Sequence, residues 1–171
     1  QDIALAYAGI HAIAMECAQE RSTYLHSGPD LGPLLRTLGR LRDDLAMIER
    51  TATLSLSEAF QLRFGAALHR VEQATAEFLR GSGAALLARG KPVPCQPVEA
   101  AVDDFAASIA ALRRHDLQPA LPAETAERIF ALAFALEQLR RNCGDLACRV
   151  AEHAEPGGLW PHVGDRSGER R

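Results

Sequence analysis

The chain has 171 residues, of which 47% are apolar, enough to bury one hydrophobic core and too many for a disordered chain. Its 19 basic and 22 acidic residues give a net charge of −3, which argues against a protein that binds the phosphate backbone of nucleic acids. Aromatic residues reach only 5%, and alanine and leucine dominate the apolar residues, a composition that favours helices. We therefore expect an all-helical globular domain without a nucleic-acid partner.

No stretch reaches the roughly 18–20 uncharged apolar residues that a membrane-spanning helix needs. The longest apolar stretch covers residues 3–15 and contains His11, so we interpret it as part of a buried helix. The chain begins at Gln1 without a leader pattern. It is therefore either a processed chain or a piece cut from a longer protein, and we favour the piece, which we expect to be soluble.

The first predicted helix runs from Ile3 to about Leu25 and ends at Gly28 and Pro29, residues that stop a helix. We interpret His11, on its apolar side, as a core histidine with a polar partner rather than a metal ligand. The helical period predicts the following buried residues: Ile3, Ala6, Ile10, Ile13, Cys17 and Tyr24.

A second predicted helix spans Leu31 to about Thr51, with Asp30 as its N-terminal cap. Apolar residues recur along it at alternating steps of four and three, which is typical of an amphipathic helix. The residues of this apolar stripe are Leu34, Leu38, Leu41, Leu45 and Ile48.

A third helix follows, and we expect Gly81, Ser82 and Gly83 to weaken or break it before a short extension over residues 84–88. Three prolines within residues 90–97 then predict an extended connector. The buried sides of the third and fourth helices are predicted at Phe64, Leu68, Val71, Thr75, Phe78, Val98, Ala101, Phe105, Ile109 and Leu112.

The last predicted helix, over residues 126–151, has the most regular apolar pattern of the chain and is expected to be central. Neighbouring residues, including Phe130, widen its apolar stripe to the breadth of a helix that touches more than one neighbour. The stripe itself, with a 3.5-residue period, consists of Ile129, Leu132, Leu136, Leu139, Cys143, Leu146 and Val150.

These elements predict one antiparallel helical bundle of about five helices without a sheet, covering residues 1–154. Residues 155–171 are rich in glycine, proline and charge, and we interpret them as a tail. The sequence contains no H-E-x-x-H or di-iron E-x-x-H pattern, no phosphate-binding glycine loop and no G-x-S-x-G. We therefore expect no catalytic residues, no cofactor and no metal site.

Charged residues gather on the second and fifth predicted helices. Arg140 flanks the apolar stripe, so we expect it at a helix interface. Either the two charged faces meet and their network sets the register of the helices, or each faces solvent independently; the sequence leaves both alternatives open. The candidate residues for an interface or charge network are Arg36, Arg40, Arg42, Asp43, Asp44, Glu137, Arg140 and Arg141.

Two stretches resemble a known family: GPDLGPLLRTLGRLRDDLAMIERTA at residues 28–52 and ALPAETAERIFALAFALEQLRRNCGDLACRVAE at residues 120–152. They are similar to the soluble segment of FUSC-type proteins, the fusaric acid resistance or aromatic acid exporter family of the bacterial inner membrane. The chain departs from the family pattern at Cys143, Gly144 and Cys148.

This resemblance implies a cytoplasmic helical domain that lies between the two transmembrane bundles of a proton-driven efflux protein for aromatic or other organic acids. It implies a role in assembly or gating without catalysis, with the transmembrane part of the same chain as a partner and a homo-oligomer as the assembly. The alternative is a sensory or ligand-binding module that holds a small organic acid near Arg36 or Arg140.

Overall fold

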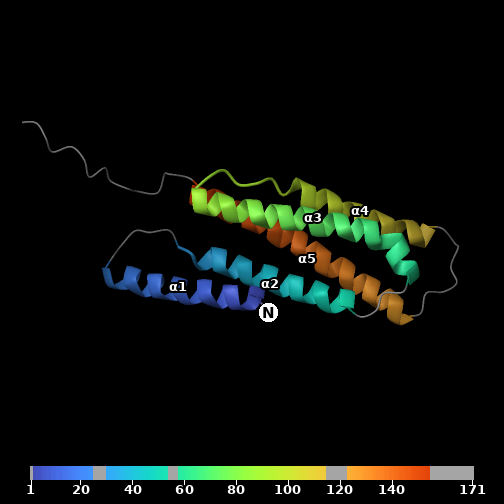
Figure 1. The fold of residues 1–171 in the computed structure, drawn as a ribbon, viewed down its shortest axis with the longest axis horizontal. Coiled ribbons are helices and arrows are strands. Elements are labelled where there is room, and N and C mark those ends of the chain that lie inside the picture. Colours follow the sequence, from blue (N-terminus) through green and yellow to red (C-terminus); the bar gives the residue numbers. More distant parts are fainter. Residues whose placement is uncertain (1, 25–29, 54–57, 115–122, 155–171) are drawn as a thin grey trace, which may run out of the picture.

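The fold is an all-α bundle, seen in a computed structural model that describes residues 2–24, 30–53, 58–114 and 123–154 (Figure 1). No strand occurs within these ranges, which confirms the expected fold class. The predicted tail, residues 155–171, and Leu25 at the predicted end of the first helix lie outside the described residues. The five helices are α1 (Asp2–Tyr24), α2 (Gly32–Thr53), α3 (Glu58–Ala88), α4 (Gln96–Arg114) and α5 (Ala123–Ala154).

Helix α5 is the central element, as its sequence predicts, and it packs against α2, α3 and α4. Its apolar stripe is buried along the whole helix, from Ile129 to Val150, with Cys143 completely enclosed. The prediction that Phe130 widens the buried stripe is wrong, because that ring is 51% exposed. Phe134, one turn further along α5, is likewise exposed, at 58%.

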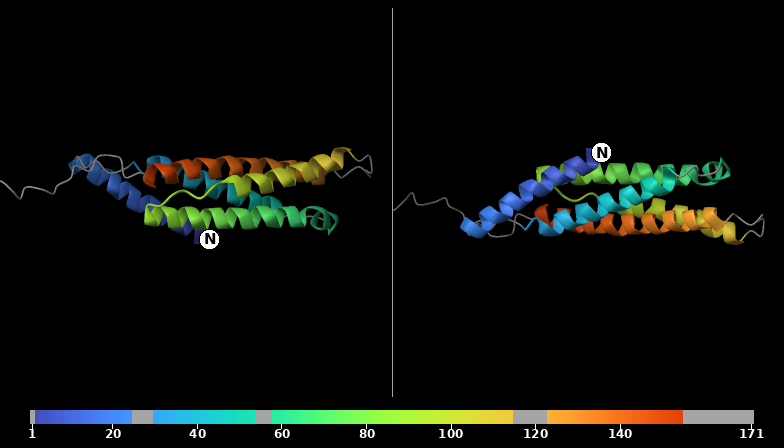
Figure 2. Two further views of the ribbon diagram at one scale, coloured as in Figure 1. Left: turned by 90° about the horizontal axis from the view of Figure 1, so that it is seen from above. Right: turned by 90° about the horizontal axis from the view of Figure 1, so that it is seen from below.

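Neighbouring helices along the chain run in opposite directions (Figures 1 and 2). Helix α2 lies antiparallel to α5, and the two share the most extensive contact in the bundle. Helices α3 and α4 form a second antiparallel pair, in which the ring of Phe64 meets the ring of Phe105 edge-on, with centroids 5.9 Å apart. The core therefore lies between the α2–α5 pair and the α3–α4 pair.

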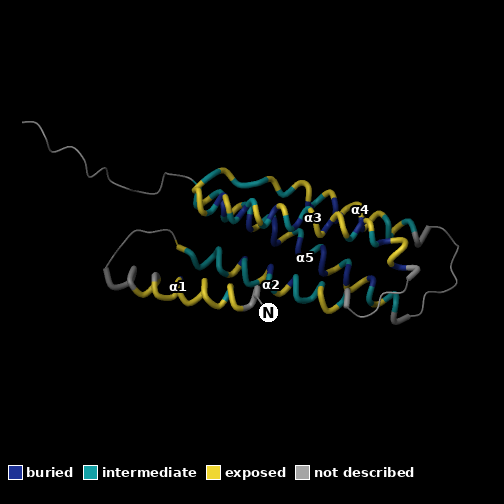
Figure 3. Tube along the Cα trace, viewed as in Figure 1, coloured by how far each residue is buried: buried dark blue, intermediate teal, exposed yellow. Residues whose placement is uncertain are grey.

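Helix α1 is placed differently from the sequence expectation. Among the described residues it contacts α2 alone, and it lies on the outside of that helix (Figure 3). The predicted burial of Ile10 and Ile13 is wrong, because their exposed fractions are 48% and 62%. His11 is also exposed and is not a core histidine, whereas Ala14 is buried. An apolar pattern alone could not show that this helix has only one neighbour.

Helix α3 continues without interruption through residues 81–83, so the predicted break is wrong. The reason is tertiary packing, because the connector passes directly over this part of the helix. A side-chain carbon added at Gly81 would lie 2.6 Å from Cγ2 of Val93. Gly81 therefore allows the connector to approach closely, and the neighbouring Ser82 is buried.

The end of α3 has the hydrogen bonds of a Schellman motif. The backbone N–H of Gly90 donates to the carbonyl of Ala85 over 2.9 Å, and that of Arg89 donates to the carbonyl of Leu86. Arg89 has a φ of 48°, in the left-handed region that usually holds glycine at this position. The chain then runs extended, as its prolines predict, until α4 begins at Gln96.

Candidate functional site

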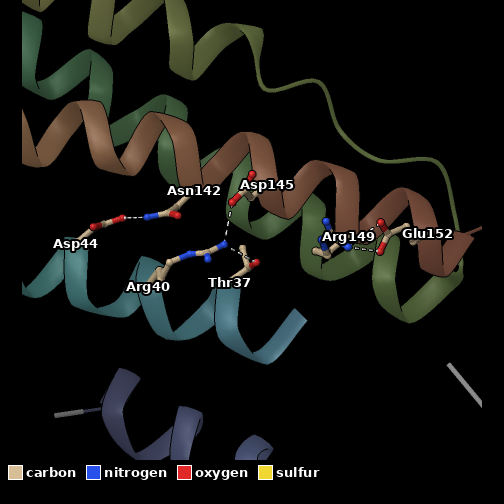
Figure 4. Close-up of polar contacts among 7 residues, drawn as sticks. All are labelled: Thr37, Arg40, Asp44, Asn142, Asp145, Arg149 and Glu152. Carbon is tan, nitrogen blue, oxygen red and sulfur yellow. Dashed lines mark hydrogen bonds and ion pairs between the residues drawn. The ribbon is translucent and has the colours of Figure 1, made fainter. Parts of the chain in front are cut away.

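The polar contact between α2 and α5 is the first candidate site (Figure 4). The side-chain amide of Asn142 donates a hydrogen bond of 2.6 Å to Oδ2 of Asp44, and both residues are buried. Burial raises the pKa of Asp44 above its ordinary value, while the hydrogen bond from Asn142 acts in the opposite direction. A buried carboxylate with one amide partner is suited to fixing the position of two helices.

A second pair lies on the exposed edge of the same interface, one turn away along both helices. Nη2 of Arg40 lies 2.8 Å from Oδ2 of Asp145, and the same nitrogen donates to the hydroxyl of Thr37 over 3.1 Å (Figure 4). The side chains of Arg40 and Asp145 are about half exposed, so this ion pair contributes well under 1 kcal/mol. This ion pair therefore contributes mainly to the orientation of α2 relative to α5.

The charged faces of α2 and α5 do meet, but through only two of the predicted residues, Asp44 and Arg40. Of their partners, Asn142 directly follows the predicted Arg140 and Arg141 in the same polar run, whereas Asp145 lies outside the predicted set. The spacing contains a signal for them, since residues 40 and 44 lie one turn apart on α2 and residues 142 and 145 lie one turn apart on α5. Antiparallel pairing brings such positions together in reverse order.

The other predicted residues of α2 make contacts away from α5. Arg42 donates to the adjacent Asp43 over 2.8 Å, and its guanidinium carbon lies 4.7 Å from the centroid of the Tyr7 ring. This stacking attaches α1 to α2, and the hydroxyl of Tyr7 adds a hydrogen bond to the carbonyl of Leu35. Arg36 is exposed on the same helix.

The predicted cluster on α5 is internal to that helix. Arg140 forms a two-pronged contact with Glu137, at 2.7 and 2.8 Å, and Arg141 donates to the same carboxylate over 3.0 Å. The hydrogen bond from Arg140 is the main cause that lowers the pKa of Glu137. Arg140 also feels the negative charges of Asp103 and Glu99, so it lies at the edge facing α4 and not at the α2 interface.

A groove of about 620 Å³ separates α2 from α3 and has α5 as its floor. Helices α2 and α3 do not pack against each other, because α5 lies behind both. Its volume falls within the range of small-molecule sites. The residues that form its α2 wall and its floor are Leu45, Ile48, Leu132, Leu136 and Leu139.

The α3 wall of the groove carries its polar groups. Thr75 is 5% exposed, and its hydroxyl has no hydrogen-bond partner among the described residues. At the rim, Nδ1 of His69 lies 3.2 Å from a carboxylate oxygen of Glu72. Neither Arg36 nor Arg140 lines this groove, so the predicted arginines do not lie at the concave surface.

Two cysteines also meet, where the connector reaches the bundle. The interaction between the thiols of Cys95 and Cys143 lowers the pKa of Cys95 and raises that of Cys143, and burial raises the pKa of Cys143 further. Both thiols are free, as is the exposed Cys148. The contact joins the start of α4 to the stripe of α5.

The described residues contain no cluster of three or more potential metal-binding side chains. None of the described helices combines the length and the apolar character needed to cross a membrane. Comparison of the chain with protein-family models, with curated proteins and with solved structures gives no match.

Proposed function

We propose that this chain is the cytoplasmic helical domain of a FUSC-type efflux protein that exports aromatic or other organic acids with proton energy. In this proposal the domain lies at the cytoplasmic face of the bacterial inner membrane. Its partners are the transmembrane part of the same chain and further copies of itself. Its role is to assemble the protein or to gate the membrane part, and it carries out no catalysis.

One observation carries the proposal: the two stretches that resemble the family form a single structural unit. Residues 28–52 contain most of α2 and residues 120–152 contain most of α5, and these helices share the largest contact in the bundle. The hydrogen bond between Asp44 and Asn142 lies inside that contact. Two stretches that both resemble the family, lie far apart in sequence and are adjacent in space support a shared fold better than either stretch alone.

The contacts of the charged residues support an architectural role. Asp44 is held by Asn142, Arg40 by Asp145, and Glu137 by two arginines of its own helix, so these groups act on one another. Hydrogen bonds and ion pairs of this kind fix the register between helices or stabilise a single helix. A domain of this kind transmits position from one part of a larger protein to another.

The test is a resistance assay with the full-length protein in a bacterial strain that lacks its own aromatic-acid exporters. We expect the wild-type protein and the Asp44→Asn variant to confer resistance to aromatic carboxylic acids. We expect Asp44→Ala, which leaves Asn142 unpaired, to lower resistance at equal protein level in the membrane. Full resistance after deletion of residues 1–154, or a robust hydrolase or transferase activity of the isolated chain, would contradict the proposal.

The groove supports a second candidate function, a ligand-binding module. Its apolar walls suit a largely apolar molecule, such as one that carries an aromatic ring. Calorimetric titration of the chain with aromatic carboxylates tests this. Binding that Gly65→Trp, which fills the groove from α3, weakens at least tenfold supports a ligand site. No heat and no thermal shift at millimolar ligand contradict it.

A further inference from the structure

Cys95 and Cys143 form a pair of thiols where the connector joins α4. Cys95 directly precedes α4, and its carbonyl accepts backbone hydrogen bonds from Val98 over 2.9 Å and from Glu99 over 3.1 Å. Its half-buried side chain packs against the apolar core, in which Cys143 of α5 is completely enclosed. The two thiols interact directly. The fold therefore brings together two cysteines that lie far apart in the sequence.

Cys95 has the surroundings of a reactive thiol. It lies at the N-terminus of α4, where unpaired backbone N–H groups carry a partial positive charge that stabilises a thiolate. The pKa of Cys95 is lowered, mainly by the interaction with Cys143 and further by the charge of Arg140, although burial and the charge of Glu99 act in the opposite direction. Because the thiolate is the form that attacks an oxidant, Cys95 is the nucleophile of the pair.

Cys143 has the surroundings of a thiol that reacts only through Cys95. Its exposed fraction is 0%, so an oxidant in solution does not reach it directly. The interaction with Cys95 raises its pKa and burial raises the pKa further, so this thiol stays protonated at neutral pH. Redox-sensitive cysteines are accessible, have a lowered pKa and often lie next to a second thiol that resolves the oxidised form. Cys143 is placed as that second thiol.

The pair suits a disulfide better than a metal ion. Metal binding requires both sulfurs to be thiolates, and the enclosed position of Cys143 opposes a charge there. Among the described residues, no third potential metal-binding side chain joins the pair. A disulfide, in contrast, carries no charge and leaves the core around Cys143 apolar.

We propose that Cys95 and Cys143 are a modification site at which a peroxide, such as hydrogen peroxide, oxidises the two thiols to a disulfide. This inference goes beyond the proposed efflux role and does not depend on it. The bond fastens the connector and the start of α4 to the central helix α5.

The reaction has two steps. In the first, the sulfur of Cys95 attacks one oxygen of hydrogen peroxide: an S–O bond forms, the O–O bond breaks, and the leaving hydroxide takes the thiol proton as water. In the second, the sulfur of Cys143 attacks the resulting sulfenic acid on Cys95: the S–S bond forms, the S–O bond breaks, and hydroxide leaves with the proton of Cys143 as a second water. The two thiols lose two electrons and the peroxide gains them.

The experiment exposes the reduced, folded 171-residue chain to hydrogen peroxide and then blocks the remaining thiols with N-ethylmaleimide. Peptide mapping by mass spectrometry without reductant identifies the product at each of the four cysteines. We expect a disulfide between Cys95 and Cys143 as the main product, formed about threefold or more faster than any oxidation of the exposed Cys148. Dithiothreitol should restore both thiols.

Three variants separate the two steps, and circular dichroism checks that each keeps its helix content. Cys143→Ala removes the second thiol, so the sulfenic acid on Cys95 should persist and react with dimedone several-fold more than in the wild-type chain. Cys95→Ser keeps a residue that is favoured before a helix, and we expect Cys143 to stay reduced. Cys148→Ser is the matched control, because it changes an exposed cysteine of the same helix as Cys143. It should form the disulfide at the wild-type rate.

Several results would overturn the inference. One is a main product that involves Cys17 or Cys148, and another is oxidation of Cys95 that gives no bond to Cys143. A disulfide that forms only in urea would also overturn it, because such a bond would not come from the folded contact. The efflux role would in each case still be decided separately by the resistance assay.

Discussion

The amide of Asn142 and the carboxylate of Asp44 are hydrogen-bonded over 2.6 Å between α5 and α2, and each residue is only 8% exposed. The pair is buried between two helices whose facing stripes are apolar. Apolar side chains pack almost equally well in several registers, whereas a buried polar pair is satisfied in only one. The pair therefore selects one alignment of α2 on α5.

Removal of one partner tests the energetic contribution of this pair. In Asp44→Ala the amide of Asn142 stays buried without an acceptor, and we expect the free energy of unfolding to fall by about 2–3 kcal/mol. In Asp44→Asn an amide oxygen still accepts the hydrogen bond and the buried charge disappears, so stability at pH 7 should change by less than about 1 kcal/mol. Urea unfolding followed by circular dichroism measures both. Equal losses in the two variants would contradict a hydrogen-bond role.

The pH dependence of stability follows from the raised pKa of Asp44. A carboxyl whose pKa is higher in the folded than in the unfolded chain binds its proton more readily when folded. Its contribution is thus most favourable at low pH and is lost as the pH rises from about 4 through the folded pKa. We expect the stability of the wild-type chain relative to Asp44→Asn to fall over this interval and to become constant above it.

This comparison removes the effect of Glu137, which has the opposite sign. The hydrogen bond from Arg140 lowers the pKa of Glu137, so its stabilisation is present above its unfolded pKa and is lost as the pH falls through the folded value. Both proteins carry that effect equally. Urea unfolding at intervals between about pH 3.5 and 8 gives the difference. A difference that does not vary with pH would show that Asp44 titrates alike in both states.

Glycines 81 and 83 of α3 should respond to alanine in opposite directions. An alanine normally stabilises an exposed helix position by about 0.5–1 kcal/mol relative to glycine, and we expect this gain in Gly83→Ala. In Gly81→Ala the new carbon meets Val93 at 2.6 Å, and we expect a net loss of about 1–2 kcal/mol. Thermal and urea unfolding measure both. The double variant Gly81→Ala with Val93→Ala should recover part of the loss.

Arg89 is a position where glycine should stabilise the chain. Its φ of 48° costs a residue with a side chain about 1 kcal/mol, and glycine adopts the same conformation without that cost. We expect Arg89→Gly to raise the free energy of unfolding by about 1 kcal/mol and Arg89→Ala to leave it nearly unchanged. Urea unfolding of the two variants side by side decides this. A gain of equal size in both would trace the effect to the arginine charge.

The sequence predicts the parts of this fold that depend on local pattern. The stripe of α5 is buried throughout, and Asp30 accepts a hydrogen bond from the backbone N–H of Gly32 as a cap should. The extended connector follows from its prolines. In each case the residues involved are close in sequence, so one helix or one turn determines their environment.

Features that depend on which helices meet could not be predicted in this way. The exposure of Ile13 reflects the lack of a second neighbour for α1 among the described helices. The unbroken α3 at Gly81 reflects the passage of Val93 over it. The partner of Arg40 lies 105 residues away on another helix. The groove exists because α2 and α3 pack on α5 and not on each other, which no single segment encodes.

The single neighbour of α1 has a consequence for the way the chain opens. Helices α2 to α5 are linked through α5, so disrupting one of them weakens the contacts of the others. Within the described residues, helix α1 is held through its contact with α2 alone, at Tyr7 and its surroundings, and it can separate while the other four helices keep their core. The chain thus has two cooperative units of unequal stability. Backbone amides of α1 would therefore exchange with solvent at a lower free energy than those of α5.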